Sequence, residues 1–203
     1  MPLPNPVTTD TPRQPIQLSR EQRRWVAPIE DFLPGFVETS SWRWLAPHEL
    51  PPAARRLLAH DQDMTPTLGR FHDSEIDLEV RRRELSGDAL HRLVMLHRRS
   101  DGKSVEVGAI NILLSGFDQP LRRAIEAGGE PLGGILNRFK LPHSSHPRAF
   151  FSCAAAVVAE RLGGLEVAAT PYGTYAYGRC NELRHDDGQI FAEIVEILPP
   201  GGF

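Results

Sequence analysis

The sequence contains little of what marks several large classes of protein. Its 203 residues include two cysteines, Cys153 and Cys180, too few to indicate a disulfide framework or a zinc site. We expect both thiols to be reduced and partly buried. The formal net charge of -3 gives no overall attraction to nucleic acid or to an anionic membrane surface. We therefore expect no nucleic-acid partner.

Long apolar runs are also missing. The segment AFFSCAAAVVA at 149–159 is far shorter than the roughly 20 residues that a membrane-spanning helix needs. The first residues, MPLPNPVTTDTPRQPIQ, contain no apolar core of a signal peptide. We expect a soluble cytoplasmic protein with no integral membrane segment.

What is present suits one globular domain. The chain is 40% hydrophobic and 24% charged, a balance that allows a sizeable core. Residues 1 to about 20 are rich in Pro and Thr and poor in large apolar side chains. We expect residues 1–40 to be a Pro-rich, partly disordered N-terminal extension, and residues 41–203 to be the folded domain.

The segment HDDGQIFAEIVEIL at 185–198 predicts a turn followed by a strand. Because side chains alternate across a strand, one face carries Ile190, Ala192, Ile194, Glu196 and Leu198. Glu196 is the one charged residue on that apolar face. A buried carboxylate without a partner costs several kcal/mol, so Glu196 must be protonated, paired or bound to a polar group.

A second hairpin is predicted at 89–114, ALHRLVMLHRRSDGKSVEVGAINILL, around the turn Ser100-Asp101-Gly102-Lys103. In its first strand Arg92 is the odd residue on a face of Leu90, Val94 and Leu96. Arg92 and Glu196 thus carry opposite charges on apolar faces of similar elements, and the two side chains could meet. Two interpretations stay open: a structural ion pair that bridges two strands, or polar anchors of a ligand site.

Helices are predicted between the strands. PPAARRLLAH at 51–60 indicates a short amphipathic helix, and DMTPTLGRF at 63–71 a second one, with Thr65 as N-cap and Pro66 at the first helical position. SEIDLEVRRREL at 74–85 alternates as a half-exposed strand. In DQPLRRAIEAGGEPLGGILNRF, Asp118 is the expected N-cap, and a second short helix begins after Glu130-Pro131. Hairpins with helices grouped between them predict an α+β domain on an antiparallel sheet.

Some stretches give weaker signals. Residues 141–170 show no clear periodicity. HSSH at 143–146 contains two histidines without further ligands nearby, so we expect a solvated loop and no metal. Arg179 in YGR suits a second anion contact or, equally, a surface arginine at a strand end.

Four of these segments, in this order, resemble the chorismate pyruvate-lyases: DMTPTL, LHRLVML, EPLGGIL and YGRC…DDGQIFAEIVEILP, within residues 57–199. The resemblance implies a chorismate lyase-like fold and a cofactor-free enzyme that converts chorismate to 4-hydroxybenzoate and pyruvate, a step in ubiquinone or aromatic-acid biosynthesis. It implies no metal and no redox cofactor. The oligomeric state is open.

The resemblance also implies roles for particular residues. Arg92 in LHRLVML corresponds to the family's carboxylate-binding arginine, and Glu196 in VEILP to its essential glutamate. Met64 and Leu132 correspond to two residues whose backbone groups contact the substrate or product. In this interpretation Arg92 holds a carboxylate and Glu196 exchanges a proton with the leaving group or the ring hydroxyl.

Two alternatives to the enzyme remain. The same fold serves as the effector-binding domain of a group of transcription regulators, where it binds a small aromatic or carboxylate ligand without chemistry. The other alternative is a catalytically silent interaction module, whose cavity would be filled with side chains.

Overall fold

The computed structural model describes residues 16–163, 174–200 and 203, and in this part of the chain it contains one seven-stranded antiparallel sheet. The strand order is β1-β5-β6-β7-β4-β3-β2. The strands are β1 Arg43–Leu45, β2 Ile76–Ser86, β3 Ala89–Arg98, β4 Ser104–Leu113, β5 Ser144–Ala154, β6 Tyr175–Arg184 and β7 Ile190–Leu198. The helices are α1 Arg20–Phe32, α2 Phe36–Thr39, α3 Pro52–Leu58, α4 Met64–His72, α5 Gln119–Ala127, α6 Leu132–Arg138 and α7 Ala155–Leu162, with a 3-10 turn, η1, at Pro47–Glu49.

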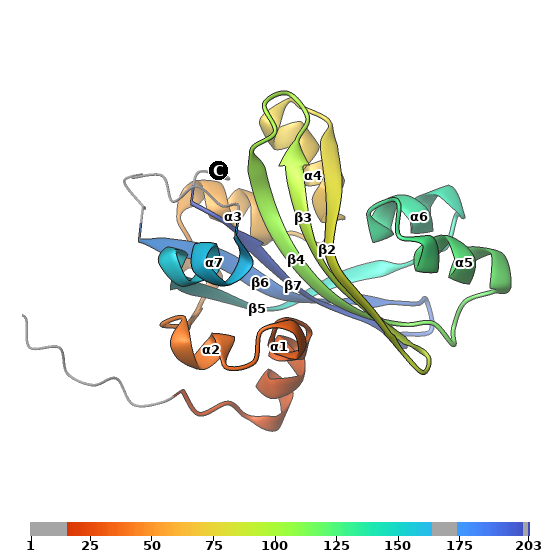
Figure 1. Cartoon of the computed structure of the whole chain (residues 1–203), viewed down its shortest axis with the longest axis horizontal. Helices are drawn as coiled ribbons and strands as arrows, with labels where there is room; N and C mark the ends of the chain where they lie inside the picture. Colours follow the sequence, from red (N-terminus) through yellow and green to blue (C-terminus); the bar gives the residue numbers. More distant parts are fainter. Residues whose placement is uncertain (1–15, 164–173, 201–202) are drawn as a thin grey trace, which may run out of the picture.

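The two faces of the sheet are covered by different helices (Figure 1). On one face, Leu93, Met95, Val107 and Val195 pack with the buried side of α1 and α2. On the other face the strands pack against α3, α4, α5 and α6 in two further clusters. Because side chains alternate along each strand, every central strand contributes to both layers.

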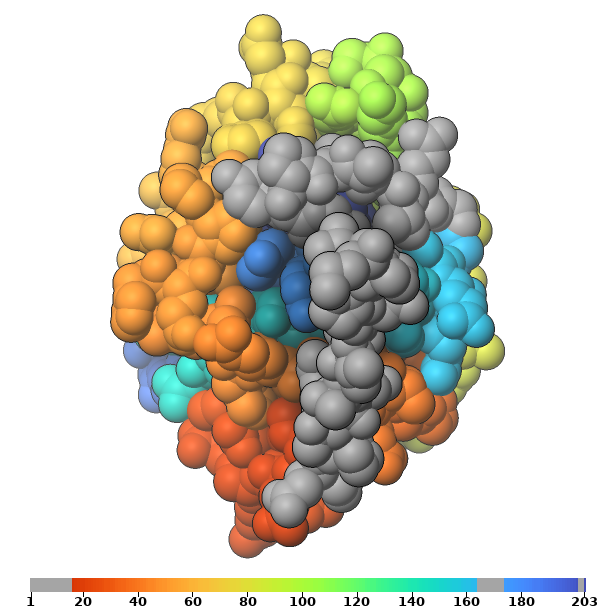
Figure 2. All heavy atoms as spheres, turned by 90° about the vertical axis from the view of Figure 1, so that its left-hand side faces the viewer, coloured from red at the N-terminus to blue at the C-terminus, as the bar shows by residue number. Residues whose placement is uncertain are grey.

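At the end of the molecule shown in Figure 2, the orange segment that includes α3 lies on one side and α7, in cyan, on the other. Blue and teal strand atoms are visible between them. In this region the short strand β1 pairs with β5, so that Trp44 lies opposite Phe151. Trp42 stacks on the Phe151 ring at 3.6 Å between ring centroids. Aromatic side chains therefore pack together where β1 joins the sheet.

Most elements expected from the sequence are present. The α+β class and the antiparallel sheet are confirmed, as are both hairpins, with Gly102 and Gly188 at positive φ in their turns. Asp118 caps α5 by accepting a hydrogen bond from the backbone N–H of Leu121 at 2.9 Å, and Gly128 ends that helix in the left-handed conformation. Local turn and cap chemistry therefore predicted these boundaries correctly.

Two local predictions were wrong. The helix α4 begins at Met64 with Asp63 as N-cap, so the cap lies two residues before Thr65. The HSSH segment is not a solvated loop: Ser144 begins the strand β5, and Ser145 is buried. Strand β5 was missed because its residues form no apolar alternation, with Pro147 and Arg148 in its middle.

The N-terminal boundary also differs from the expectation. Disorder was expected for residues up to about 20, and residues 1–15 lie outside the described part of the chain. Within the rest of the expected extension, α1 and α2 form, and Val26, Ile29 and Phe36 are buried against the sheet. Ser19 caps α1 through a reciprocal capping box with Gln22. The core therefore includes residues well before position 41.

Within the described ranges, no helix combines the length and apolarity needed to cross a bilayer.

Candidate binding site in the sheet cavity

A cavity of about 90 Å³ lies between the sheet and the starts of α4 and α6. Its floor consists of side chains from one face of the central strands β3, β4, β6 and β7. Its lining includes Arg92, Val94, Leu96, Glu106, Gly108, Ile110, Arg179, Asn181, Leu183, Ile194 and Glu196 from those strands, and Met64 and Leu132 from the helices. All five residues that the sequence analysis assigned to a site, at 64, 92, 132, 179 and 196, thus face one cavity. The cavity is not filled with side chains, as the alternative of a catalytically silent interaction module would require.

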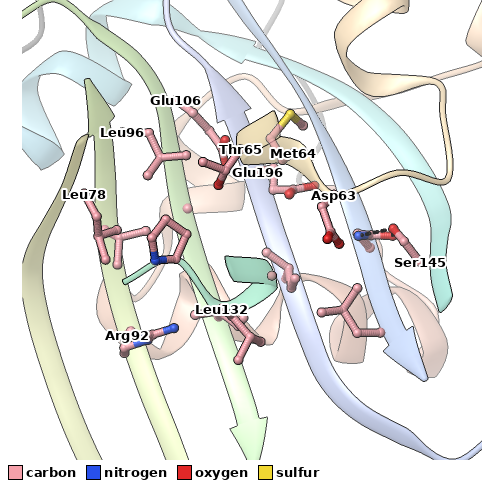
Figure 3. Close-up of a pocket in the computed structure, with 18 of the residues that line it drawn as sticks. Asp63, Met64, Thr65, Leu78, Arg92, Leu96, Glu106, Leu132, Ser145 and Glu196 are labelled. Carbon is pink, nitrogen blue, oxygen red and sulfur yellow. Dashed lines mark hydrogen bonds between the residues drawn. The ribbon is translucent and has the colours of Figure 1, made fainter. Parts of the chain in front are cut away.

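Arg92 stands at one end of the cavity (Figure 3). The residue is 2% exposed, and neither Nε nor Nη1 has a hydrogen-bond partner among the described residues. Burial, with a smaller contribution from the charge of Arg83, lowers the pKa of Arg92 to about 10, so the guanidinium remains charged at neutral pH. A buried cation without a counter-ion is costly, and an anion in the cavity would relieve that cost.

Of the two interpretations left open for Arg92 and Glu196, an ion pair between them is not formed. The Glu196 carboxylate forms its ion pair with Arg179, through Nε of the arginine. Arg179 Nη1 also donates to the backbone oxygens of Leu58 at 3.0 Å and His60 at 2.8 Å. Arg179 is 0% exposed in the middle of β6, so it is not a surface arginine at a strand end. It holds Glu196 and the chain after α3 in place.

Glu106 is a cavity residue that the sequence analysis missed. It lies on β4, is 4% exposed, and its Oε2 has no hydrogen-bond partner in the described part of the chain. Burial raises the pKa of Glu106 well above its usual range, the Glu196 charge raises it further, and Arg179 opposes both. Alternation in the sequence could have identified Glu106. It is the one charged residue on its strand face, as Glu196 is on its own; that face consists of Ser104, Glu106, Gly108, Ile110 and Ile112.

The helices α4 and α6 bring their first residues, Met64 and Leu132, to the cavity wall, as expected. Asp63 connects the two elements. Its carboxylate accepts hydrogen bonds from Asn137 Nδ2 at 3.0 Å and from His143 Nε2 at 3.2 Å. Hydrogen bonding from His143 lowers the pKa of Asp63, and the same bond raises the pKa of His143.

The polar groups of the cavity leave one positive charge unbalanced. Arg179 and Glu196 neutralise each other, and Asp63 is paired with His143. Burial disfavours the charged form of Glu106 and raises its pKa. The guanidinium of Arg92 therefore remains, which suits a ligand with a single negative charge.

No group of three or more His, Cys, Asp or Glu side chains in the described ranges is arranged to hold a metal ion. Cys153 and Cys180 are free and fully buried, more so than expected. Burial raises the pKa of both thiols far above the usual range, which keeps them as inert core residues.

Neither a protein-family model nor a curated protein matches this sequence. Solved structures do resemble it. PhnF from Mycobacterium smegmatis matches with a TM-score of 0.50 and 10% identity over 70% of this chain and 65% of that chain. A gene product of Staphylococcus aureus matches with a TM-score of 0.47 and 8% identity over 70% and 92%. The effector-binding domain of the trehalose repressor of B. subtilis matches with a TM-score of 0.35 and 11% identity, over 60% of this chain and 89% of that chain.

These comparisons concern the fold. The chain has a chorismate lyase-like α+β fold, and PhnF shares its arrangement. The match spans less than two thirds of the PhnF chain.

Proposed function

We propose that this protein binds a small organic monocarboxylate in the sheet cavity, with Arg92 as the anchor of the carboxylate. The observation that carries the proposal is the buried Arg92 side chain, which lines the cavity and whose Nε and Nη1 have no hydrogen-bond partner among the described residues. Guanidinium groups bind carboxylates through two parallel hydrogen bonds, and a desolvated pair of this kind is strong.

The size of the cavity supports a small ligand. Its volume of about 90 Å³ holds several waters or one compact acid of about the size of a single ring. Apolar residues such as Val94, Leu96 and Ile110 form much of the wall, and polar groups stand at its ends. This distribution suits an aromatic or other planar acid that is oriented by few polar contacts.

Turnover of chorismate to 4-hydroxybenzoate and pyruvate is a second candidate function. The observation in its favour is that Arg92, Glu196 and the first residues of α4 and α6 line one cavity. These are the positions to which the resemblance to the chorismate pyruvate-lyases assigns roles. The Arg179–Glu196 ion pair leaves Glu196 as a proton acceptor or an orienting group rather than a resting proton donor.

Two measurements on one preparation test both candidates. Titration calorimetry with benzoate and 4-hydroxybenzoate should show saturable binding, and Arg92→Met should weaken it at least tenfold, because the carboxylate loses its charged partner. A coupled assay for pyruvate release from chorismate decides between binding alone and turnover. If the unmodified protein binds neither acid and releases no pyruvate, both candidates are wrong.

A further inference from the structure

Glu106 occupies the end of the cavity away from Arg92, beside Glu196 (Figure 3). In the sheet register Glu106 lies opposite Leu96, whereas Arg92 lies opposite Ile110, four residues further along β4. Four residues of strand span about 13 Å, so the two groups mark opposite ends of the cavity floor. Gly108, between them on the same face, has no side chain to fill the gap.

At the end of the cavity remote from Arg92, the carboxyl groups of Glu106 and Glu196 therefore lie beside one arginine, Arg179. Nε of Arg179 is engaged by Glu196, and Nη1 by the backbone oxygens of Leu58 and His60. Oε2 of Glu106 is buried without a partner among the described residues. An unpaired negative charge on Glu106 at this depth would be strongly unfavourable, and a proton on Glu106 removes that cost.

We propose that Glu106 carries a proton in the empty site and donates a hydrogen bond to a ligand oxygen at the end remote from Arg92. The Glu196 carboxylate accepts a hydrogen bond from the same ligand atom. Among the described residues, Arg179 is the hydrogen-bond partner of Glu196 and binds Oε2, which leaves Oε1 for the ligand. This inference rests on the proposed function, and it deepens that function by naming the polar group of the ligand.

Glu106 and Glu196 together favour a hydroxyl group on the ligand. A hydroxyl group both accepts and donates a hydrogen bond, as Glu106 and Glu196 together require. A carbonyl oxygen cannot donate to Glu196, and an ammonium group cannot accept from Glu106. The ligand class is therefore a compact hydroxy acid, with its carboxylate on Arg92 and its hydroxyl between the two glutamates.

The charged and titratable groups around Glu106 determine its response to pH. Glu196 on β7 and Arg179 on β6 face it from the sheet. His60 lies behind Arg179, with its pKa lowered by burial and by that arginine. Raising the pH through the pKa of Glu106 removes the donor and adds a negative charge. The affinity for the hydroxyl should therefore fall as the pH rises.

The test compares benzoate with 4-hydroxybenzoate by calorimetry on the full chain and two variants. The unmodified protein should bind 4-hydroxybenzoate about tenfold more tightly than benzoate, as expected for a satisfied buried hydrogen bond. Glu106→Leu should reduce this preference to about twofold or less, with benzoate affinity nearly unchanged. Glu106→Gln keeps a donor, so it should retain the preference and lose its dependence on pH.

The outcomes separate the two proposals. Binding of both acids with a preference that survives Glu106→Leu overturns the role of Glu106 and leaves the proposed function standing. Absence of binding to the unmodified protein overturns the proposed function and this inference with it. A thermal melt of each variant verifies folding, and Glu106→Gln decides the matter if Glu106→Leu does not fold. Loss of the preference in a folded Glu106→Gln variant also contradicts donation by Glu106.

Discussion

At the scale of single residues, Arg92 and Arg179 are two buried arginines on one sheet face. We expect Arg92 to lower the stability of the fold and Arg179 to raise it. Arg179 has its counter-ion and two carbonyl acceptors, whereas Nε and Nη1 of Arg92 have no partner in the described part of the chain. Arg92→Met should therefore raise the free energy of unfolding by about 1–3 kcal/mol, since it removes a buried charge without a partner. The same change should abolish tight binding of carboxylates. Chemical denaturation and calorimetry measure the two effects.

Arg179→Met is the matched control, because it makes the same substitution on the neighbouring part of the same face. It leaves Glu196 as a buried carboxylate without its partner, so it should destabilise the protein by about 3–5 kcal/mol. If both variants lose stability equally, Arg92 has a structural role and is not a ligand anchor.

At the scale of secondary-structure elements, the Asp63 cluster holds the starts of α4 and α6 together at the cavity wall. His143 has an oxygen acceptor at each ring nitrogen, Asp63 at 3.2 Å and the backbone oxygen of Leu141 at 3.0 Å. Both ring nitrogens must carry a proton to satisfy both acceptors, so this geometry favours the imidazolium form. We expect Asp63→Asn to lower the free energy of unfolding by about 1.5–3 kcal/mol and to weaken ligand binding.

The pH dependence of the stability lost in Asp63→Asn follows from the pKa shifts of Asp63 and His143. The lowered pKa of Asp63 means that its contribution is present above pH 3.8 and is lost as the pH falls through its folded value. The raised pKa of His143 means that its contribution is present below pH 6.5 and is lost as the pH rises through its folded value. The difference between the unmodified protein and Asp63→Asn should thus be largest between these two pH values. Asp61→Asn, at an exposed position nearby, is the control and should leave the free energy of unfolding nearly unchanged.

At the scale of the whole molecule, α1 forms part of the domain rather than an appendage. It covers the sheet face opposite the cavity, and Ile29 is 0% exposed there. Ile29→Asp should place an unpaired carboxylate in this layer and cost more than 4 kcal/mol, enough to remove the cooperative thermal transition. Arg20→Asp, at the exposed start of the same helix, should leave the melting temperature nearly unchanged. Equal behaviour of the two variants would contradict the packing of α1.

The sequence by itself determined the features that depend on neighbouring residues. Alternation placed Glu196 and Arg92 on apolar strand faces, Asp118 marked the start of α5, and Gly102 and Gly188 marked the turns. These signals are local because strand pleat, caps and turns involve residues only a few positions apart. The resemblance to chorismate lyases then added Met64 and Leu132, and both begin helices at the cavity.

The tertiary structure decided which charges meet. Arg179 and Glu196 are direct register partners on the adjacent strands β6 and β7. Arg92 lies on β3, and β4 separates it from β7, so its guanidinium reaches the cavity without meeting Glu196. Strand order is set by packing between segments far apart in the chain, which no local pattern encodes. For the same reason the sequence placed α1 outside the domain, although its apolar side chains Val26, Ile29 and Phe32 are buried in the layer against the sheet.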